Sequence, residues 1–356
     1  SMGFSGTDMY HHLDFLNQGE KYRREFIKIL NEKYTTTKRA DADFFKSIMA
    51  FFKGAFGGRK YAYLLVTISR AALITGMAIA ALIAFRAGLF NIGGEGQLVI
   101  GGLASAFVAI NLPFGGPAGI FLVLLAGMIA AGVWAIIAGI MKLWLGVPIL
   151  VGTLLLNYPA RYIASYFVSH PLRDISSGMP QTHLIEKSLW LPLIPGTRLD
   201  IGFIFILLVF CLVLIYCYRT VGGYEAKMTG LSIDFANASG LKTKKISLKT
   251  LALSGAIAGL VGAIAVLGLH HRFTDGMLVQ PLYAWTGIVA ALMVSLIPWA
   301  VLPAGFFFAA IHSGASGMER TADVPKEIAI IIQGMIILFV ASKVPTAFNQ
   351  NIGDGK

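Results

Sequence analysis

Charged residues are scarce in this sequence. Only 13% of the 356 residues are Asp, Glu, Lys or Arg, while 56% are hydrophobic, and the mean hydropathy is +0.72. A soluble domain carries about 25% charged residues. The depletion of charge excludes an ordinary soluble domain and predicts an integral membrane protein.

Cysteines and catalytic motifs are also few. The two cysteines, Cys211 and Cys217, lie in one apolar run, about 9 Å apart along a helix, which is too far for a disulfide. We find no HExxH motif, no paired acids and no Cys/His set, so we expect neither a metal site nor an enzyme. A complete G-x-x-x-x-G-K-[ST] loop is missing too, so ATP hydrolysis by that motif is not expected in this chain.

Apolar runs dominate residues 61–342. The candidate spans are 61–85, 98–112, 118–144, 148–168, 201–218, 246–269, 285–297, 301–315 and 328–342. Several are shorter than the roughly 20 residues that cross a bilayer, and Pro298 and Pro303 separate two of them. We predict an all-α polytopic membrane protein with about eight to ten transmembrane helices, some of them broken or short.

Residues 1–60 are more polar than the rest of the chain. Within them, residues 44–56 alternate lysines with phenylalanines, which predicts an amphipathic helix at the membrane surface. We therefore divide the chain into this N-terminal segment, a transmembrane domain at 61–342 and a tail at 343–356.

The basic residues lie mostly in the tails and loops, which explains the net charge of +11 better than nucleic-acid binding does. The loop 219–249 holds six basic and two acidic residues, whereas the loop 169–200 holds three of each. By the positive-inside rule, 219–249 and the tail are cytoplasmic and 169–200 is external. Alternation of the spans then places residues 1–60 outside, whereas their lysines favour the inside. Either residues 1–60 are external, or the stretch 86–112 is re-entrant.

The most informative segment is FRAGLFNIGGEGQ, from Phe85 to Gln97. It places Asn91, Glu95 and Gln97 among four glycines, between two apolar runs. A charge at the centre of a bilayer costs about 2.5–3.5 kcal/mol on insertion scales, and irregular polar backbone is tolerated there only inside protein or along a cavity. The segment predicts part of a solute pathway.

Each of these side chains also has a structural alternative. Glu95 could contact a solute or could tie a broken helix to its neighbours. The amides of Asn91 and Gln97 suit ribose hydroxyls or a base edge, but amides equally join helices within membranes.

Three other spans contain isolated polar or aromatic residues. Asn157, Tyr158 and Arg161 share one span, and Arg161 could pair with Glu95 or extend to the interface. Trp285 could stack on a ring-bearing solute or belong to an interfacial aromatic belt. Gln333 stands alone in the last span and is a further pathway candidate.

The loop 219–249 contains a second candidate site. Its residues Gly230 to Gly240 suit a short helix between two glycines, with an acid in the first turn. Such a helix could dock into a motor protein, although an ordinary solvated loop is the alternative. The docking residues predicted are Gly230, Ser232, Asp234, Ala236, Asn237, Ser239, Gly240 and Lys242.

Four stretches together resemble one family. They are FRAGLFNIGGEGQ, the segment LLLNYPARYIASYF from Leu154, the run from Gly230 to Ala263, and the run from Glu319 to Ala341. The sequence resembles permease subunits of bacterial ABC importers of the branched-chain amino acid, ribose and nucleoside class, and most of all the nucleoside (simple-sugar) permeases. One departure is YAWTGIVAALMVS from Tyr283, where such permeases usually carry an acid.

This resemblance implies the ABC importer permease fold and import of nucleosides by alternating access, with riboflavin or a monosaccharide as the alternative. It implies a separate ABC ATPase that binds ATP and Mg²⁺, with no cofactor in this chain. It also implies a second permease subunit in a heterodimer, a substrate-binding lipoprotein, and a multi-pass location in the bacterial cytoplasmic (inner) membrane. An ion-coupled transporter would need acids or histidines through several spans, and Glu95 is nearly alone.

Overall fold

The computed structural model describes residues 40–58, 61–197 and 199–322, together with 327, 331, 334 and 335. Every regular element in these residues is a helix, which confirms the predicted all-α class. The only β-type pairing among them is a set of isolated bridges between loops, such as Gln181 with Thr274.

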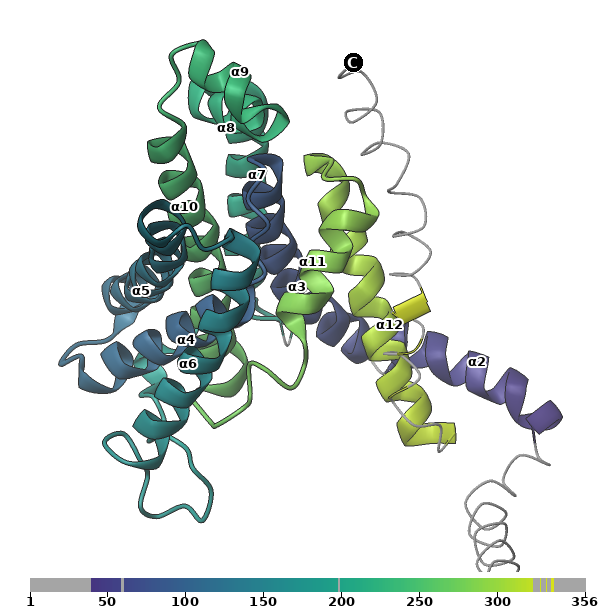
Figure 1. The fold of residues 1–356 in the computed structure, drawn as a ribbon. Coiled ribbons are helices and arrows are strands. Elements are labelled where there is room, and N and C mark those ends of the chain that lie inside the picture. Colours follow the sequence, from purple (N-terminus) through teal and green to yellow (C-terminus); the bar gives the residue numbers. More distant parts are fainter. Residues whose placement is uncertain are drawn as a thin grey trace, which may run out of the picture.

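The helices follow the predicted spans closely (Figure 1). They are α2 (Ala40–Phe56), α3 (Ala62–Arg86), α4 (Gly94–Asn111), α5 (Gly116–Leu145), α6 (Ile149–Ser169), α7 (Gly202–Arg219), α8 (Val221–Leu231), α9 (Ile233–Ala238), α10 (Thr243–Ile264), α11 (Tyr283–Met293) and α12 (Val301–Ala322), with short turns η3 (Lys187–Leu189), η4 (Ala265–His270) and η5 (Pro298–Ala300).

Among the described residues, five helical stretches are long and apolar enough to cross a membrane: α3, α5, α7, α10 with η4, and η5 with α12. The helices α4 and α6 are long enough but carry polar groups, and α11 has only 11 residues. The protein is therefore polytopic. The predicted number of eight to ten spans stays a prediction, because most of 328–342 lies outside the described residues.

Glycines allow α4, α5 and α10 to pack with their backbones almost in contact. A Cβ atom at Gly101 of α4 would lie 2.3 Å from the Cα of Gly259 in α10, and one at Gly259 would lie 2.2 Å from the carbonyl oxygen of Gly127 in α5. Small residues at helix crossings are typical of membrane bundles. These glycines therefore build the core of the bundle.

The helix α3 connects two opposite sides of the molecule. Near its start, Ser69 lines a small pocket with Asp200, the last residue of the loop 169–200. Just after its end, Gly88 contacts Gly230 of α8. Figure 1 shows α8 and α9 at the top and the loop below α6 at the bottom. We call these the α9 side and the loop side.

The helix α4 returns to the loop side. The residue Gly115, which follows α4, packs on Ser188 in the loop 169–200. The stretch 86–112 therefore runs from one side to the other and does not turn back. As a result α3 starts on the side opposite α9, as the alternation of spans predicts. Which side faces the cytoplasm stays a prediction.

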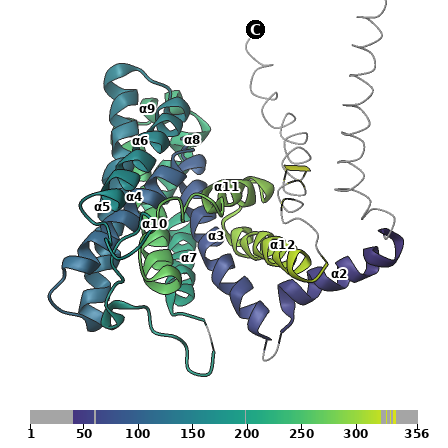
Figure 2. The ribbon, with the colours of Figure 1, turned by 90° about the horizontal axis from the view of Figure 1, so that it is seen from below.

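The helix α2 forms a flank together with α12. A Cβ atom at Gly54 would lie 2.5 Å from the Cα of Gly317, and Phe51 packs on Gly314. Figures 1 and 2 both show the two helices side by side, away from α5 and α6. The residues predicted as a surface helix at 44–56 lie in α2, and their depth in a membrane stays a prediction.

Candidate solute pathway and docking surface

The polar break forms a closed hydrogen-bonded turn between α3 and α4. The side-chain amides of Asn91 and Gln97 bond each other reciprocally at 3.1 and 3.0 Å. The Asn91 Oδ1 atom also accepts from the Gly93 backbone N–H (3.0 Å), and its Nδ2 donates to the Ser254 hydroxyl in α10 (3.0 Å). Both amide side chains are buried, so their polar groups are used within the protein.

Two residues of α6, four apart and hence on one helix face, hold the start of α4. The Oδ1 atom of Asn157 accepts from the Gly96 backbone N–H (2.8 Å), and its Nδ2 donates to the Ile92 carbonyl oxygen (3.2 Å). The Thr153 hydroxyl accepts from the Ile92 backbone N–H (3.2 Å). The first N–H groups of a helix need such acceptors, so Asn157 acts here as a capping residue supplied from another helix.

Glu95 joins three helices. Its Oε1 atom forms an ion pair with the guanidinium of Arg161 in α6, and its Oε2 accepts from the Trp285 indole N–H in α11 at 3.0 Å. The Glu95 side chain is only 2% exposed. Of the two alternatives for Arg161, the structure shows pairing with Glu95.

The residues around this ion pair differ in accessibility. The Arg161 side chain is 42% exposed, Trp285 is 37% exposed and Tyr158 is 54% exposed. The Arg161 guanidinium lies 5.8 Å from the centre of the Tyr158 ring, a cation–π contact. Of the predicted pathway residues that the structure describes, Tyr158 and Trp285 are therefore accessible, whereas Asn91, Glu95, Gln97 and Asn157 are buried. Gln333 lies outside the described residues.

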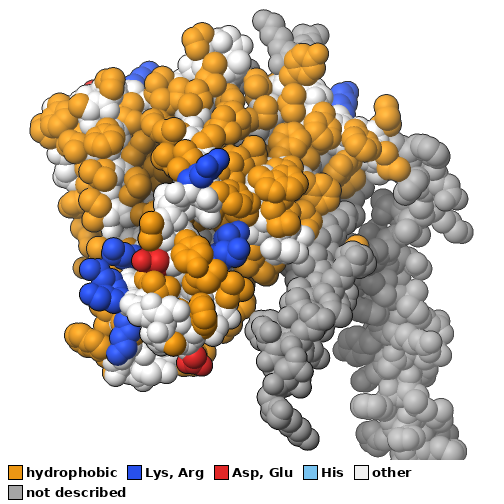
Figure 3. All heavy atoms as spheres, turned by 90° about the horizontal axis from the view of Figure 1, so that it is seen from above, with side chains coloured by type: hydrophobic (Ala, Val, Ile, Leu, Met, Phe, Trp, Pro, Cys, Tyr) orange, Lys and Arg blue, Asp and Glu red, His pale blue; other side chains and the backbone are white. Residues whose placement is uncertain are grey.

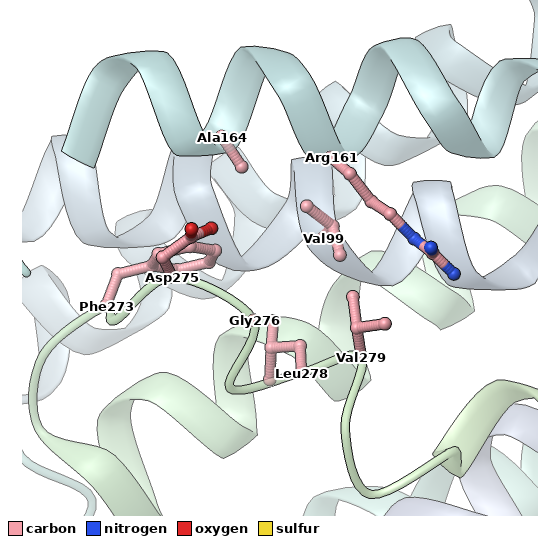
Figure 4. A pocket seen from close by; sticks show the side chains of 8 residues that line it. All are labelled: Val99, Arg161, Ala164, Phe273, Asp275, Gly276, Leu278 and Val279. Carbon is pink, nitrogen blue, oxygen red and sulfur yellow. The ribbon is translucent and has the colours of Figure 1, made fainter. Parts of the chain in front are cut away.

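A cavity of about 110 Å³ adjoins Arg161. Its walls are α4, α6 and the segment 273–279, which follows η4. Figure 4 shows Arg161 at one end and the Asp275 carboxylate at the other, with Val99 and Ala164 between them. The Ser165 hydroxyl donates to Asp275 Oδ2 at 3.2 Å. The cavity thus offers opposite charges at its two ends and an apolar middle.

The sequence reasoning missed Ser254, Thr153 and Asp275. Single hydroxyls in apolar helices carry no motif, because they equally bond their own backbone. Asp275 lies in a turn whose neighbours are set by the fold, so its proximity to Arg161 had no sequence signal.

The loop 219–249 contains two helices, α8 and α9, and the predicted docking residues lie at the end of α8, in α9 and just after it. Ser232 caps α9, since its hydroxyl accepts from the Phe235 backbone N–H at 3.2 Å. The Asn237 side chain accepts from the Thr243 hydroxyl at 2.7 Å, which ties α9 to α10. Ala236 is fully buried, and Gly240 ends the segment with φ of +80°, a conformation that favours glycine.

The outer surface of this segment is apolar at its tip and basic around it. Leu231, Ile233 and Phe235 are 65%, 49% and 61% exposed. Figure 3 views this side of the molecule, which is largely orange, and its scattered blue side chains outnumber the red ones. The exposed basic residues are Arg219, Lys227, Lys242, Lys244, Lys245 and Lys249. An apolar tip within a basic rim suits docking to another protein.

The docking segment contacts the polar break directly. A Cβ atom at Gly230 would lie 2.2 Å from the Arg86 carbonyl oxygen and 2.8 Å from the Gly88 backbone nitrogen. Gly88 has φ of +71° and begins the turn that contains Asn91. A displacement of α8 therefore reaches the turn before Glu95 through backbone contact alone.

A polytopic helical fold with a polar break held at the crossing of α4, α6 and α11 defines a membrane transport component. The chain belongs to the family of branched-chain amino acid transport system permease components, whose model matches residues 63–341. As an ABC permease it works with an ATPase and a substrate-binding component. Residues 1–53 also match a model of a domain of unknown function.

Three curated relatives are similar over most of their length. The guanosine ABC transporter permease protein of Bacillus subtilis is 31% identical over 84% of this chain and 86% of its own. The glucose ABC transporter permease protein of Haloferax volcanii is 31% identical over 72% and 70%. The nucleoside ABC transporter permease protein of Lactococcus lactis is 27% identical over 73% and 74%. No solved structure is significantly similar.

Proposed function

We propose that this chain lines the solute path of an ATP-driven nucleoside importer. The observation that carries the proposal is the exposed face of α6 beside the Glu95–Arg161 pair. Tyr158, Tyr162 and Tyr166 are 54%, 75% and 58% exposed, one on each turn, with Arg161 and Ser165 between them. Charged side chains in spanning segments almost always face the bundle interior or a water-filled cavity, which supports a solute path beside Arg161.

The chemistry of this face suits a nucleoside. The exposed rings of Tyr158 and Trp285 offer stacking surfaces for a base, and stacking on aromatic side chains contributes about 1–3 kcal/mol per base. Hydroxyl groups and the Arg161 guanidinium can bond ribose oxygens or a base edge. The names of two relatives, guanosine and nucleoside permeases, support the same class.

The remaining subunits supply energy and specificity. A companion ABC ATPase would bind ATP and Mg²⁺ and dock on α8 and α9, while this chain holds no cofactor and performs no covalent chemistry. A second, different permease would face α6 and close the path, and a lipoprotein outside the membrane would deliver the solute. We place the assembly in the bacterial cytoplasmic membrane, with the α9 side inward.

A monosaccharide is the second candidate, because one relative is a glucose permease, and riboflavin is the third. An ion-coupled mechanism is disfavoured because both oxygens of Glu95 already have protein partners, which leaves no free acid at that position to carry a proton.

The decisive experiment is uptake into proteoliposomes that contain the chain with its co-purifying subunits and lipoprotein. We expect ATP-dependent uptake of labelled guanosine that excess adenosine reduces and excess glucose or riboflavin does not. Trp285→Leu should lower guanosine uptake at least tenfold, whereas Leu208→Ala on the apolar face of α7 should leave it unchanged. Uptake of glucose but no nucleoside would refute the proposal.

A further inference from the structure

A second cavity, of about 490 Å³, lies apart from the Glu95–Arg161 pair. It opens between α3, η4, α12 and the turn before α11, near the loop side of the molecule. Its polar lining residues are Ser69, Arg70, Asp200, His270, Gln280, Tyr283, His312 and Ser316. We call it the α3–α12 cavity. Pockets for small molecules commonly measure about 300–1,000 Å³, so this volume suits a nucleoside or a monosaccharide.

The charges around the α3–α12 cavity balance. Arg70 supplies a positive charge, held by hydrogen bonds from its Nη1 atom to the hydroxyls of Ser313 (3.3 Å) and Ser316 (3.4 Å). Asp200 supplies a negative charge. A phosphate site would need an excess of positive groups, and the described residues contain no cluster of metal ligands. The lining therefore suits an uncharged solute with both donors and acceptors.

One buried polar atom of the lining lacks a protein partner. The Nε2 atom of His270 is buried without a hydrogen bond to any described residue. Buried polar atoms nearly always have a partner, and a rotation of the imidazole ring toward the cavity would let a hydroxyl or amide group of a bound solute bond this nitrogen.

The backbone around the cavity is held in unusual conformations. His270 ends a π-helical turn, and the next residue, His271, has φ of +56°. Leu282, just before Tyr283, has φ of +55°. The Trp190 ring stacks on His271 at 3.8 Å between ring centres and fixes it there. π-helical turns and left-handed non-glycine residues recur at functional sites.

We propose that the α3–α12 cavity is a second solute site in this chain, for an uncharged, polyhydroxylated solute of nucleoside or monosaccharide size. The inference rests on the proposed function for the choice of nucleosides, while the charge balance, the unpartnered imidazole nitrogen and the strained walls support the site itself.

The test is equilibrium dialysis of tritiated guanosine with the purified complex in nanodiscs, in the absence of the lipoprotein. His270→Leu removes the nitrogen, and Ser69→Phe fills part of the cavity from α3. We expect each variant to bind one guanosine fewer per copy of this chain at saturation, because the face of α6 beside Arg161 is unchanged. The matched control is His183→Leu, which alters an exposed histidine on the same side of the molecule and should bind like the wild type.

The outcomes separate the two proposals. If the wild type imports and binds guanosine but both cavity variants bind it equally well, the second site is refuted and the proposed function stands. If inorganic phosphate displaces guanosine from the wild type, the charge argument and the site fail. If the wild type neither imports nor binds any nucleoside, the proposed function is refuted. The second site would still be supported if the wild type bound tritiated glucose and both cavity variants did not. If the complex with His270→Leu does not assemble, guanosine binding by the Ser69→Phe complex alone tests the site.

Discussion

Glu95 joins three helices beside the solute path that we propose. Its carboxylate bonds α6 through Arg161 and α11 through Trp285. Removing one partner of a buried ion pair costs about 3–5 kcal/mol, because the other charge stays buried and unpaired. Since the Arg161 side chain is 42% exposed, water relieves part of this penalty, and we expect the lower end of that range.

The first prediction separates these two roles by a double-mutant cycle. Glu95→Leu should destabilise the purified complex by about 3 kcal/mol, because the Arg161 charge loses its partner. The double variant Glu95→Leu/Arg161→Leu should recover most of that loss, since neither charge remains, yet should not recover uptake. Thermal unfolding and guanosine uptake measure the two effects. Full uptake by the double variant would show that the Glu95–Arg161 pair is not part of the solute path.

The second prediction concerns pH and Asp200, which lies just before α7. Burial raises the pKa of the Asp200 carboxyl group, although the hydrogen bond from the Gly202 backbone N–H (2.7 Å) opposes the shift. A raised folded-state pKa favours the folded protein below the ordinary Asp pKa of about 3.9, and this contribution is lost as the pH rises through the folded pKa.

As the pH is raised from about 4, the melting temperature of Asp200→Asn should therefore decrease less than that of the wild type. Thermal unfolding of both proteins across that pH series measures it. Glu186→Gln is a matched control, because Glu186 is an exposed carboxylate in the loop 169–200. An equal slope for Asp200→Asn and the wild type would contradict the assignment.

At the scale of elements, the contact between α8 and the end of α3 is the shortest connection from the docking surface to the polar break. It consists of Gly230 against the backbone of residues 86–88. Such a contact transmits displacement without side-chain rearrangement, because no flexible atoms lie between the two backbones.

The third prediction is that Gly230→Val uncouples ATP hydrolysis from uptake. The added side chain would force α8 away from Gly88, at a cost of about 1–3 kcal/mol typical of overpacking. ATP hydrolysis by the complex should continue while guanosine uptake falls several-fold. Gly222→Ala, in the same helix, meets only the Tyr216 side chain and should keep both activities. Equal loss of the two activities in Gly230→Val would argue against a transmitting contact.

The sequence predicted most elements because hydrophobic length is a strong signal. The predicted spans 61–85 and 201–218 differ from α3 and α7 by one residue at each end. The sequence did not predict α8, whose VGGYEAKMTGL segment contains three glycines. It also did not predict that α12 extends to Ala322, beyond the predicted end at 315. In both cases tertiary packing stabilises the helix more than local propensity does.

The candidate site was predictable in its residues but only partly in its contacts. The cost of polar groups in lipid singled out Asn91, Glu95 and Gln97, and the choice between solute and protein partners depended on which helices meet them. Asn157 bonds the backbone at residues 92 and 96 only because α6 crosses the start of α4. Such a crossing is set by the whole fold and leaves no local pattern.

At the scale of the molecule, two exposed faces differ in chemistry. The face of α7 presents Ile204, Leu208, Leu212 and Ile215, which are all more than half exposed and apolar, and it suits lipid. The face of α6 presents tyrosines, a serine and Arg161. An arginine at the centre of a lipid-facing helix costs about 2.5–3.5 kcal/mol on insertion scales, so the α6 face needs a partner or water.

The fourth prediction follows from this contrast. Produced without the companion permease that we propose, the chain should be degraded several-fold faster than together with it, because the α6 face would meet lipid. Pulse-chase labelling in membranes measures the half-life. Replacing Arg161 and Glu95 together by leucine should lengthen the half-life of the lone chain. Equal half-lives with and without the companion would indicate that lipid or water already satisfies this face.

The glycine contacts at the centre of the bundle set a limit on how this protein can change over generations. Any side chain at position 101 or 259 must push two helical axes apart, and no single neighbouring change can make room, since the nearest obstructing atoms are backbone. A mutant library grown on the imported solute as sole nitrogen source should therefore keep glycine at both positions. Along α7, in contrast, one apolar residue type should be replaced by another without loss of growth.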